Sequence, residues 1–387
     1  MFVYLDNSAT TKPYVEVVDE MTLMMTETFG NPSSMHKLGV AVEKKIKTAR
    51  RTIEKALGAE EKSVIFTSGG TEANNMAILG VARRHKRKGQ HIITTVVEHP
   101  AVLSSCQQLE KEGFEVTYLP VDATGSISIE DFKAALRKDT ILVAIMHVNN
   151  EVGRIQPIKA VGQLLKNMKP KPHFHVDAVQ SFEKLAFKVK ALNVDSMAIS
   201  GHKIHGPKGI GALYLKKDLR IEPLFFGGGQ EQDIRPGTEN ALGIVGFAKA
   251  VEETERQKSS VLEQVASLKA SLLTELSTID DIKINSLADD GGAPHIVNIS
   301  FKGVRGEVLL HTLEMKNIFV STGSACASNK NKSYSYVLEN MGLSIPEKEG
   351  AIRFSLSHTL TENDIKFAAE EVIKAVVELR SIIKGRV

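Results

Sequence analysis

The sequence predicts an α/β protein whose main part is a largely parallel β-sheet covered by helices. Apolar, strand-like runs alternate with helical patterns from about residue 63 to residue 148, and repeated strand-helix units produce parallel sheets. The chain has 387 residues, of which 42% are hydrophobic, so it can bury a large core and a smaller second one. We therefore expect a large domain over residues 14–255 and a smaller α+β domain built from residues 1–13 and 256–387.

Charge and composition argue against a nucleic-acid or membrane protein. Basic residues (49) nearly balance acidic ones (46), and the net charge of +3 is too small to indicate a nucleic-acid partner by itself. The basic run 83–88 is typical of the solvated last turn of a helix, where cations suit the dipole; an RNA-binding patch is the alternative. No apolar run approaches the roughly 18 residues of a membrane span, and residues 1–6 do not resemble a signal peptide.

The two cysteines, Cys106 and Cys326, form no disulfide framework and indicate a reducing compartment, so we expect a cytoplasmic protein. Cys106 lies in a helical pattern over 102–109 and is expected to be a packed helix residue. Cys326 lies among small and polar residues typical of a mobile loop, where nearby lysines such as Lys330 favour the thiolate. Of the two, Cys326 is the predicted reactive thiol. No metal site is expected.

Two polar loops precede the predicted sheet. Residues 6–13 follow a short apolar strand, and residues 29–36 form a second loop rich in Gly, Asn and Pro. Residues 40–57 then have helical spacing closed by Gly58. The first unit of the sheet is a strand at 64–66, a turn at 68–72 and a helix from about 73 to 88.

The turn before this helix is a candidate anion site. Gly70 and Thr71 stand where backbone N–H groups and the positive end of a helix dipole meet, which suits a phosphate. A simple helix cap is the alternative. The pattern continues with further strands and helices, namely strands at 91–97, 115–119 and 141–148 and helices at 101–112 and 129–136.

Polar residues follow the ends of the predicted strands, where open α/β sheets bind ligands. His99, Asn150, Asp177 and Gln180 occupy such positions. Each of these residues alone is more often structural than catalytic. A carboxylate at the end of a buried strand, such as Asp177, needs a cationic partner, and the accumulation of such residues indicates a ligand site.

Lys203 lies in a glycine-rich loop at 200–211 between the apolar runs 197–199 and 210–215. A surface turn is the ordinary explanation of such a loop. A lysine held between buried strands, however, loses hydration, and its pKa falls from about 10.4, which makes the neutral amine available for Schiff-base chemistry. The loop therefore suggests a pyridoxal phosphate enzyme.

Farther along, a second glycine-rich stretch at 226–240 contains Arg235 and Thr238, and a long helix is predicted from Ala241 to Leu276. A strand at 295–301, a helix at 306–316 and a strand around Arg353 complete the prediction. The stretch at 226–240 is predicted to be a flexible linker or a source of anion ligands. Arg353 is predicted to form a surface ion pair or to bind a carboxylate with two hydrogen bonds.

The motif Ser200-Gly201-His202-Lys203, followed by Gly206-Pro207-Lys208-Gly209, resembles the cofactor-lysine motif of the cysteine desulfurases. The resemblance covers nearly the whole chain. It implies the fold type I (aspartate-aminotransferase-like) architecture of pyridoxal-phosphate enzymes. It also implies that Lys203 binds the cofactor covalently, that His99 stacks on its ring and that Asp177 pairs with its nitrogen. The remaining implied cofactor contacts are Asn150 and Gln180 at the phenolic oxygen and Gly70, Thr71, Ser200 and His202 at the phosphate.

The resemblance also assigns later residues. Cys326 in Gly323-Ser324-Ala325-Cys326 resembles the cysteine that takes sulfur from the substrate, and Arg353 matches the clamp on the substrate carboxylate, with Asn150 beside it. Thr238 matches the residue that reaches the phosphate of a partner subunit, which implies a homodimer. Ser357-His358 stands where the family often has Gly-Arg, a departure whose effect the sequence leaves open.

We therefore interpret the chain as a cysteine desulfurase that converts L-cysteine to L-alanine and passes sulfur, through a persulfide on Cys326, to an acceptor protein. The acceptor is a tRNA thiouridine synthetase, with an iron-sulfur scaffold as the alternative. Rival interpretations are an aminotransferase or selenocysteine lyase of the same fold, in which Cys326 is dispensable, and a non-catalytic binding protein.

Overall fold

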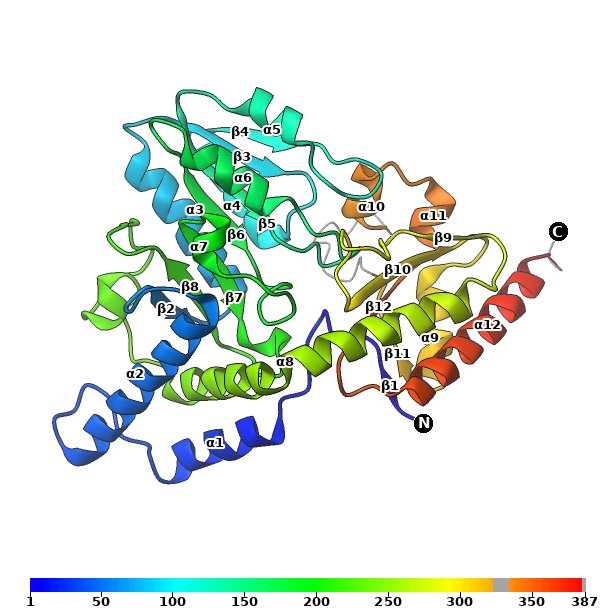
Figure 1. The fold of residues 1–387 in the computed structure, drawn as a ribbon, viewed down its shortest axis with the longest axis horizontal. Helices are drawn as coiled ribbons and strands as arrows, with labels where there is room; N and C mark the ends of the chain where they lie inside the picture. The colour runs from blue at the N-terminus through cyan, green and yellow to red at the C-terminus, as the bar shows by residue number, and fades with distance from the viewer. Residues whose placement is uncertain (323–333, 385–387) are drawn as a thin grey trace.

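The computed structural model describes residues 1–322 and 334–384. Within these ranges, the largest sheet has seven strands in the order β2-β8-β7-β6-β5-β3-β4 (Figure 1). All neighbouring strands are parallel except at β8, which is antiparallel to both β7 and β2. The predicted α/β class with a mainly parallel sheet is thus confirmed. The strands are β2 (Val64–Thr67), β3 (His91–Thr95), β4 (Glu115–Leu119), β5 (Thr140–Met146), β6 (His173–Asp177), β7 (Ser196–Ser200) and β8 (Gly211–Leu215).

Helices cover both faces of this sheet because alternate strand residues point to opposite sides. Val143 and Ile145 of β5 join one core cluster, whereas Leu142 and Ala144 join another. The first cluster also contains residues of α2, α6 and α8, and the second contains residues of α3 and α4. The helices of this part are α1 (Val15–Thr26), α2 (Lys37–Leu57), α3 (Gly70–His85), α4 (Pro100–Lys111), α5 (Ile129–Ala135), α6 (Ile158–Lys166), α7 (Val189–Leu192) and α8 (Ala241–Leu276).

Most predicted elements lie where the sequence placed them, but α3 differs at both ends. It begins at Gly70, one turn before the predicted start, and ends at His85, before the predicted Lys88. The helix starts early because Gly70 and Thr71, which the sequence predicts to lie in a turn, adopt helical geometry. At the other end Arg83 binds Glu112 with its Nε and Nη2 atoms at 3.0 and 2.7 Å, so part of the basic run lies in the last turn and forms an ion pair.

A second, smaller group of elements packs at the other end of the molecule (Figure 1). An antiparallel sheet in the order β12-β10-β9 and a parallel pair β1-β11 share one core with α9, α12 and the second half of α8. Its elements are β1 (Val3–Tyr4), β9 (Ile282–Ile284), β10 (Ile296–Phe301), α9 (Gly306–Glu314), β11 (Ile318–Phe319), α10 (Tyr336–Asn340), α11 (Ile345–Glu349), β12 (Ala351–Ser355) and α12 (Glu362–Lys384).

Helix α8 connects the two parts, as Figure 1 shows. It has 36 residues, which at about 1.5 Å per residue makes it roughly 54 Å long. Phe247 and Val251 pack in the core of the large sheet, whereas Leu268 and Leu272 pack in the core of the smaller group. The predicted boundary between residues 255 and 256 falls inside this helix, and the division into two domains stays a prediction.

The N-terminal segment also joins the two parts. β1 pairs with β11, and the Asn7 side chain donates to the Ser355 carbonyl at 2.9 Å. A few residues later, Thr11 Oγ1 donates to the His202 carbonyl at 2.9 Å. Residues 3–11 therefore run from the small sheet to the Lys203 loop. Across residues 1–322 and 334–384, no helix is both long and apolar enough to cross a membrane.

Candidate active site

Lys203 lies in a single turn of 3-10 helix, Gly201–Lys203, that follows β7 at the carboxyl edge of the large sheet. Its amine donates to the carbonyl oxygens of Ser8 at 2.5 Å and Ala9 at 2.8 Å. These two carbonyls belong to the N-terminal segment, so residues almost 200 positions away fix the direction of the lysine side chain. The sequence analysis identified the loop but missed this support, because backbone carbonyls leave no signal in a sequence.

Lys203 lines a pocket of about 280 Å³, which we call the cofactor pocket. Of the predicted site residues that the structure describes, all except Thr238 meet here. The lining consists of Ser8, Ala9, Gly70, Thr71, Asn74, His99, Met146, Val148, Asn150, Asp177, Val179, Gln180, Ser200, His202, Lys203 and Arg353. They come from the ends of several strands of the large sheet, from the start of α3 and from β12.

Asp177 provides the buried carboxylate of this pocket, at the last position of β6. Its Oδ2 accepts from Asn74 Nδ2 at 2.7 Å, and its Oδ1 accepts from the Val179 amide at 3.0 Å. Burial lowers the pKa of His175 to about 3, so this imidazole is neutral. Its Nε2 contacts Asn74 Oδ1 at 2.8 Å, and because that oxygen can only accept, Nε2 donates. This bond turns the Asn74 amide toward Asp177 and keeps the carboxylate in place.

His99 caps a helix and also lines the cofactor pocket. It is the N-cap of α4, and its Nδ1 accepts from the Ala101 amide at 3.1 Å. Burial lowers the pKa of His99, and the charge of Lys203 acts in the same direction while Asp177 opposes it. A ring that accepts through Nδ1 is neutral and carries its proton on Nε2. The cap holds this flat ring at the wall of the cofactor pocket.

The first turn of α3 forms an anion-binding end of the pocket. Gly70 and Thr71 stand at the helix N-terminus, where backbone N–H groups and the dipole favour a phosphate. A Cβ atom on Gly70 would lie 2.5 Å from Val179 Cγ2, so a larger residue would require the Val179 side chain to shift. Ser200 and His202 complete this end, and burial, followed by the charge of Lys203, lowers the pKa of His202 to about 4.

The cofactor pocket fits pyridoxal phosphate. The side-chain oxygens of Ser200 and Asn150 are buried and have no hydrogen-bond partner among the described residues, which is costly unless a ligand supplies one. The pocket offers an amine (Lys203), a carboxylate (Asp177), a flat imidazole (His99) and a helix N-terminus to one ligand. These groups match the aldehyde, the ring nitrogen, the ring face and the phosphate of that cofactor.

Arg353 enters the pocket from β12 and is 5% exposed. Its Nη1 donates to the Asn150 carbonyl at 2.8 Å and its Nη2 to Asp6 Oδ1 at 2.7 Å, while Nε has no partner among the described residues. The guanidinium therefore already binds one carboxylate, that of Asp6, at the edge of the cofactor pocket. Asp6 was not singled out in the sequence, because its partner is 347 positions away.

Thr238 lies apart from Lys203. It lines a separate hollow of about 200 Å³ together with Ser68 and Arg235, and Arg235 Nε donates to Glu72 Oε1 at 2.8 Å. Cys326 lies outside the described residues. Cys106 is fully buried in α4, which confirms that it is a packed helix residue, and burial raises the pKa of its thiol to about 12.

Known proteins similar to this chain share this architecture. The sequence model of the class-V aminotransferase family matches residues 3–367. The cysteine desulfurase IscS of Clostridium botulinum is 45% identical over 382 residues, which cover 98% of this chain and 96% of the relative. Two solved structures, a NifS-like protein and SspA in complex with cysteine, are each 36% identical, with TM-scores of 0.91 and 0.81. The alignment with the first structure covers 97% of this chain and 100% of that structure. The alignment with the second covers 92% of this chain and 99% of that structure.

Proposed function

The chain belongs to the class-V aminotransferase family and is a pyridoxal-phosphate-dependent cysteine desulfurase of fold type I, and from this premise we propose how its residues divide the work. The reaction converts L-cysteine to L-alanine and transfers the sulfur to a cysteine of the enzyme as a persulfide. The observation that carries the assignment of roles is the convergence of Lys203, Asp177 and His99 with the α3 N-terminus in one pocket that Arg353 also lines.

Bound pyridoxal phosphate supplies a ring that withdraws electrons from the α-carbon of the substrate. Asp177, whose carboxylate accepts from Asn74 and Val179, would pair with the ring nitrogen, and the His99 ring would lie against the ring face. Gln180 and Asn150 hold the phenolic oxygen in this assignment. The phosphate group belongs at Gly70, Thr71, Ser200 and His202.

Lys203 would hold the cofactor covalently, and its amine, when free, would move the α-proton of the substrate. Its two carbonyl partners, on Ser8 and Ala9, keep the amine at one point of the cofactor pocket, so proton transfer needs little reorientation. Arg353 takes the substrate carboxylate, with Asn150 beside it. Since Arg353 Nη2 binds Asp6, the substrate carboxylate competes with or joins that contact.

Cys326 is the proposed thiol that attacks the sulfur of the substrate. The described chain before it ends next to Arg353, because Ser321 and Arg353 exchange backbone hydrogen bonds of 2.6 and 3.1 Å, and Cys326 follows Thr322 by four positions. Cys106 cannot take this role, since burial raises its pKa to about 12 and removes it from solvent.

Replacing each cysteine separates a desulfurase from an aminotransferase of the same fold. Cys326→Ser is expected to bind the cofactor and to form no persulfide, whereas Cys106→Ser forms persulfide like the parent. Mass spectrometry after incubation with cysteine measures the added sulfur. Added mass on Cys106 and never on Cys326, or parental turnover in Cys326→Ser, would refute the role of Cys326.

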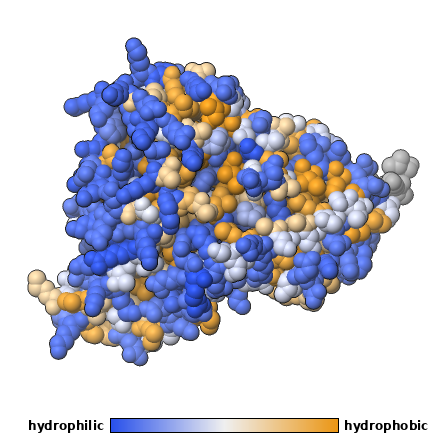
Figure 2. All heavy atoms as spheres, viewed as in Figure 1, coloured by the Kyte–Doolittle hydropathy of each residue, from blue (hydrophilic) through white to orange (hydrophobic). Residues whose placement is uncertain are grey.

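We infer that the enzyme is a homodimer working in the cytoplasm. Large hydrophobic residues are exposed on α1, in the loop before α2, at the start of α2 and near residue 225. Figure 2 shows hydrophobic atoms along the lower left edge, where α1 and that loop lie. Such surfaces are typical of subunit interfaces. The set comprises Val15, Val18, Leu23, Met25, Phe29, Met35, Leu38, Val40, Phe225 and Phe226. A dimer also gives Thr238 a role, at the phosphate of the partner subunit.

The sulfur acceptor is proposed to be a tRNA thiouridine synthetase, with an iron-sulfur scaffold protein as the alternative. The similarity of the segments 227–232, 237–240 and 293–298 to the tRNA-thiolation subgroup supports the first choice. Cysteine labelled with sulfur-35 is incubated with the enzyme and each acceptor. Label that reaches the scaffold and never the synthetase would overturn the tRNA assignment.

A further inference from the structure

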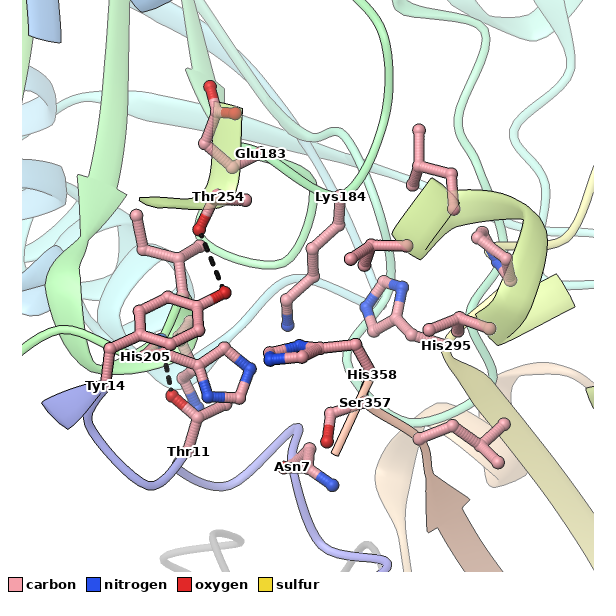
Figure 3. Close-up of a pocket in the computed structure, with 17 residues that line it drawn as sticks. Asn7, Thr11, Tyr14, Glu183, Lys184, His205, Thr254, His295, Ser357 and His358 are labelled. Carbon is pink, nitrogen blue, oxygen red and sulfur yellow. Dashed lines mark hydrogen bonds between the residues drawn. The ribbon is translucent and has the colours of Figure 1, made fainter. Parts of the chain in front are cut away.

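A second pocket lies next to the cofactor pocket and shares only Lys203 with it. We call it the histidine pocket, because His205, His295 and His358 line it (Figure 3). Its volume is about 50 Å³, whereas one water molecule needs about 10–15 Å³ measured in this way. The pocket therefore has room for a ligand of only a few atoms. His358 is one of the two residues at which the sequence departs from the family pattern.

Lys184 places a cation in this pocket. Figure 3 shows its amine between the rings of His205, His358 and His295. Its only hydrogen bond among the described residues is a long one of 3.4 Å to Gln180 Oε1, and no carboxylate of the described chain lies within ion-pair distance. Burial lowers the pKa of Lys184 to about 7, and the charges of Lys203 and Arg353 act in the same direction. The ammonium form thus lacks a counter-ion.

His295 places an unsatisfied donor beside it. The residue is 4% exposed, and neither of its ring nitrogens has a partner among the described residues. Burial lowers the pKa of His295 well below its ordinary value, and the charge of Lys184 contributes. The ring is therefore neutral and carries one N–H group, and a buried donor without an acceptor is costly. No described residue supplies the acceptor that this N–H group needs.

The other groups around the pocket add no unpaired negative charge. Glu183 lines it, but the carboxylate binds Lys258 at 2.9 Å, and burial raises the pKa of Glu183 to about 7. The Tyr14 hydroxyl pairs with Thr254 Oγ1 at 3.4 Å, and burial raises the Tyr14 pKa. His205 is neutral and donates through Nδ1 to the Lys12 carbonyl at 2.8 Å.

His358 completes the set of donors. Its ring packs edge-on against His205, with 4.6 Å between ring centroids, and burial lowers its pKa. No hydrogen bond of its ring nitrogens occurs among the described residues, so its N–H group is available to a ligand. The histidine pocket therefore offers one ammonium group and two imidazole N–H groups, and it contains no unpaired acid among the described residues.

We propose that the histidine pocket binds a small monovalent anion, a carboxylate of one carbon or a halide, held by the Lys184 ammonium group and the N–H groups of His295 and His358. The volume excludes an amino acid or a phosphate ester. Binding favours the protonated form of Lys184, so affinity increases as the pH falls.

Titration calorimetry of the cofactor-loaded enzyme with sodium formate and with sodium bromide tests this proposal. The parent protein is expected to show saturable binding of at least one of the two anions, with at least about tenfold weaker binding at pH 9 than at pH 6.5. Binding of one salt and not the other identifies the anion as a carboxylate or a halide. Binding of neither, or binding that strengthens with pH, would overturn the proposal.

Variants locate the site. Lys184→Met is expected to weaken binding by about 30-fold or more, and His295→Phe and His358→Asn by about tenfold each, because hydrogen bonds to a charged ligand are worth about that much. Lys171→Met is the control: the Lys171 amine binds Asp195 at 2.6 Å and does not line the histidine pocket, so this variant should bind the anion like the parent. His358 is only half-buried, so its replacement is tolerated even if the other variants misfold. Parental affinity in His358→Asn and in either other folded variant would place the anion elsewhere.

Discussion

The cofactor pocket and the histidine pocket share Lys203 but differ in charge. In the cofactor pocket the cations face a carboxylate, Asp177, whose orientation Asn74 and Val179 fix. In the histidine pocket Lys184 faces neutral rings, and the nearby acid, Glu183, is already bound to Lys258. This difference shows which feature predicts the kind of ligand that a pocket binds. The polar atoms without hydrogen-bond partners are more informative than the number of polar residues.

The strongest test of the comparison is Lys203→Ala. Turnover should be abolished, because no other amine of the described residues lines the cofactor pocket, while some cofactor should stay bound noncovalently through Asp177 and the phosphate-binding end. Alanine release and borohydride fixation measure the two effects. Full activity, with borohydride attaching the cofactor to another residue, would show that the site is wrongly assigned.

Asp177→Asn tests the acid that distinguishes the cofactor pocket. Losing a charged partner of the ring nitrogen should lower turnover about 100-fold and weaken cofactor retention. The control is Asp195→Asn, which removes a buried carboxylate bound to Lys171 at 2.6 Å and is expected to affect stability more than turnover. Activity assays and the visible absorbance of the bound cofactor measure the outcome, and parental turnover in Asp177→Asn contradicts the assignment.

Arg353→Lys tests whether the guanidinium binds substrate. Lysine cannot form the two parallel hydrogen bonds that arginine offers a carboxylate, so the KM for cysteine should rise about tenfold while kcat changes less. Asp6→Asn, which removes the present charged partner of Arg353, should leave the KM unchanged or lower it. Steady-state kinetics measure both constants. A fall of kcat by about tenfold with an unchanged KM would mean that Arg353 only supports the fold.

The last prediction concerns stability instead of catalysis, namely the pH dependence of stability caused by Lys184. Its pKa in the folded protein, about 7, lies below the ordinary 10.5. Between these values the unfolded chain holds the proton and the folded chain does not, so stability rises with pH from about 7 to 10. In Lys184→Met this rise should be smaller, by on the order of 2 kcal/mol. Denaturant unfolding at pH 7 and pH 9.5 gives the free energy of unfolding of the parent and of the variant. If this free energy changes equally with pH in both proteins, the Lys184 amine is well solvated.

Much of the cofactor pocket could be predicted because its residues follow strand ends or stand at a helix start, positions with local patterns. The long helix over Ala241–Leu276 was likewise predicted with its observed bounds. Asn74 was missed, although a polar residue on the buried side of an otherwise apolar helix is a signal that could have identified it. Asp6 and the carbonyls of Ser8 and Ala9 act on partners far along the chain, and no local pattern marks such contacts.

The histidine pocket could not be predicted from sequence for the same reason. Lys184, His295 and His358 come from a loop after β6, from the start of β10 and from the turn after β12, and their sequence neighbours give no sign that they meet. What the sequence did provide was the Ser357-His358 departure from the family pattern, whose place in the fold only the structure shows.

The path of residues 3–11 has a consequence for how the protein is made. This segment is synthesised first, yet its partners are β11, Ser355 and the Lys203 loop. On a ribosome that adds about 5–20 residues per second, these early residues must wait tens of seconds for β12 to emerge. The contacts of residues 3–7 with β11 and Ser355 therefore form only after nearly the whole chain has been translated. The large sheet can form during synthesis, but in a nascent chain truncated before β12 the residues just ahead of Ser8 and Ala9 should lack their Ser355 partner.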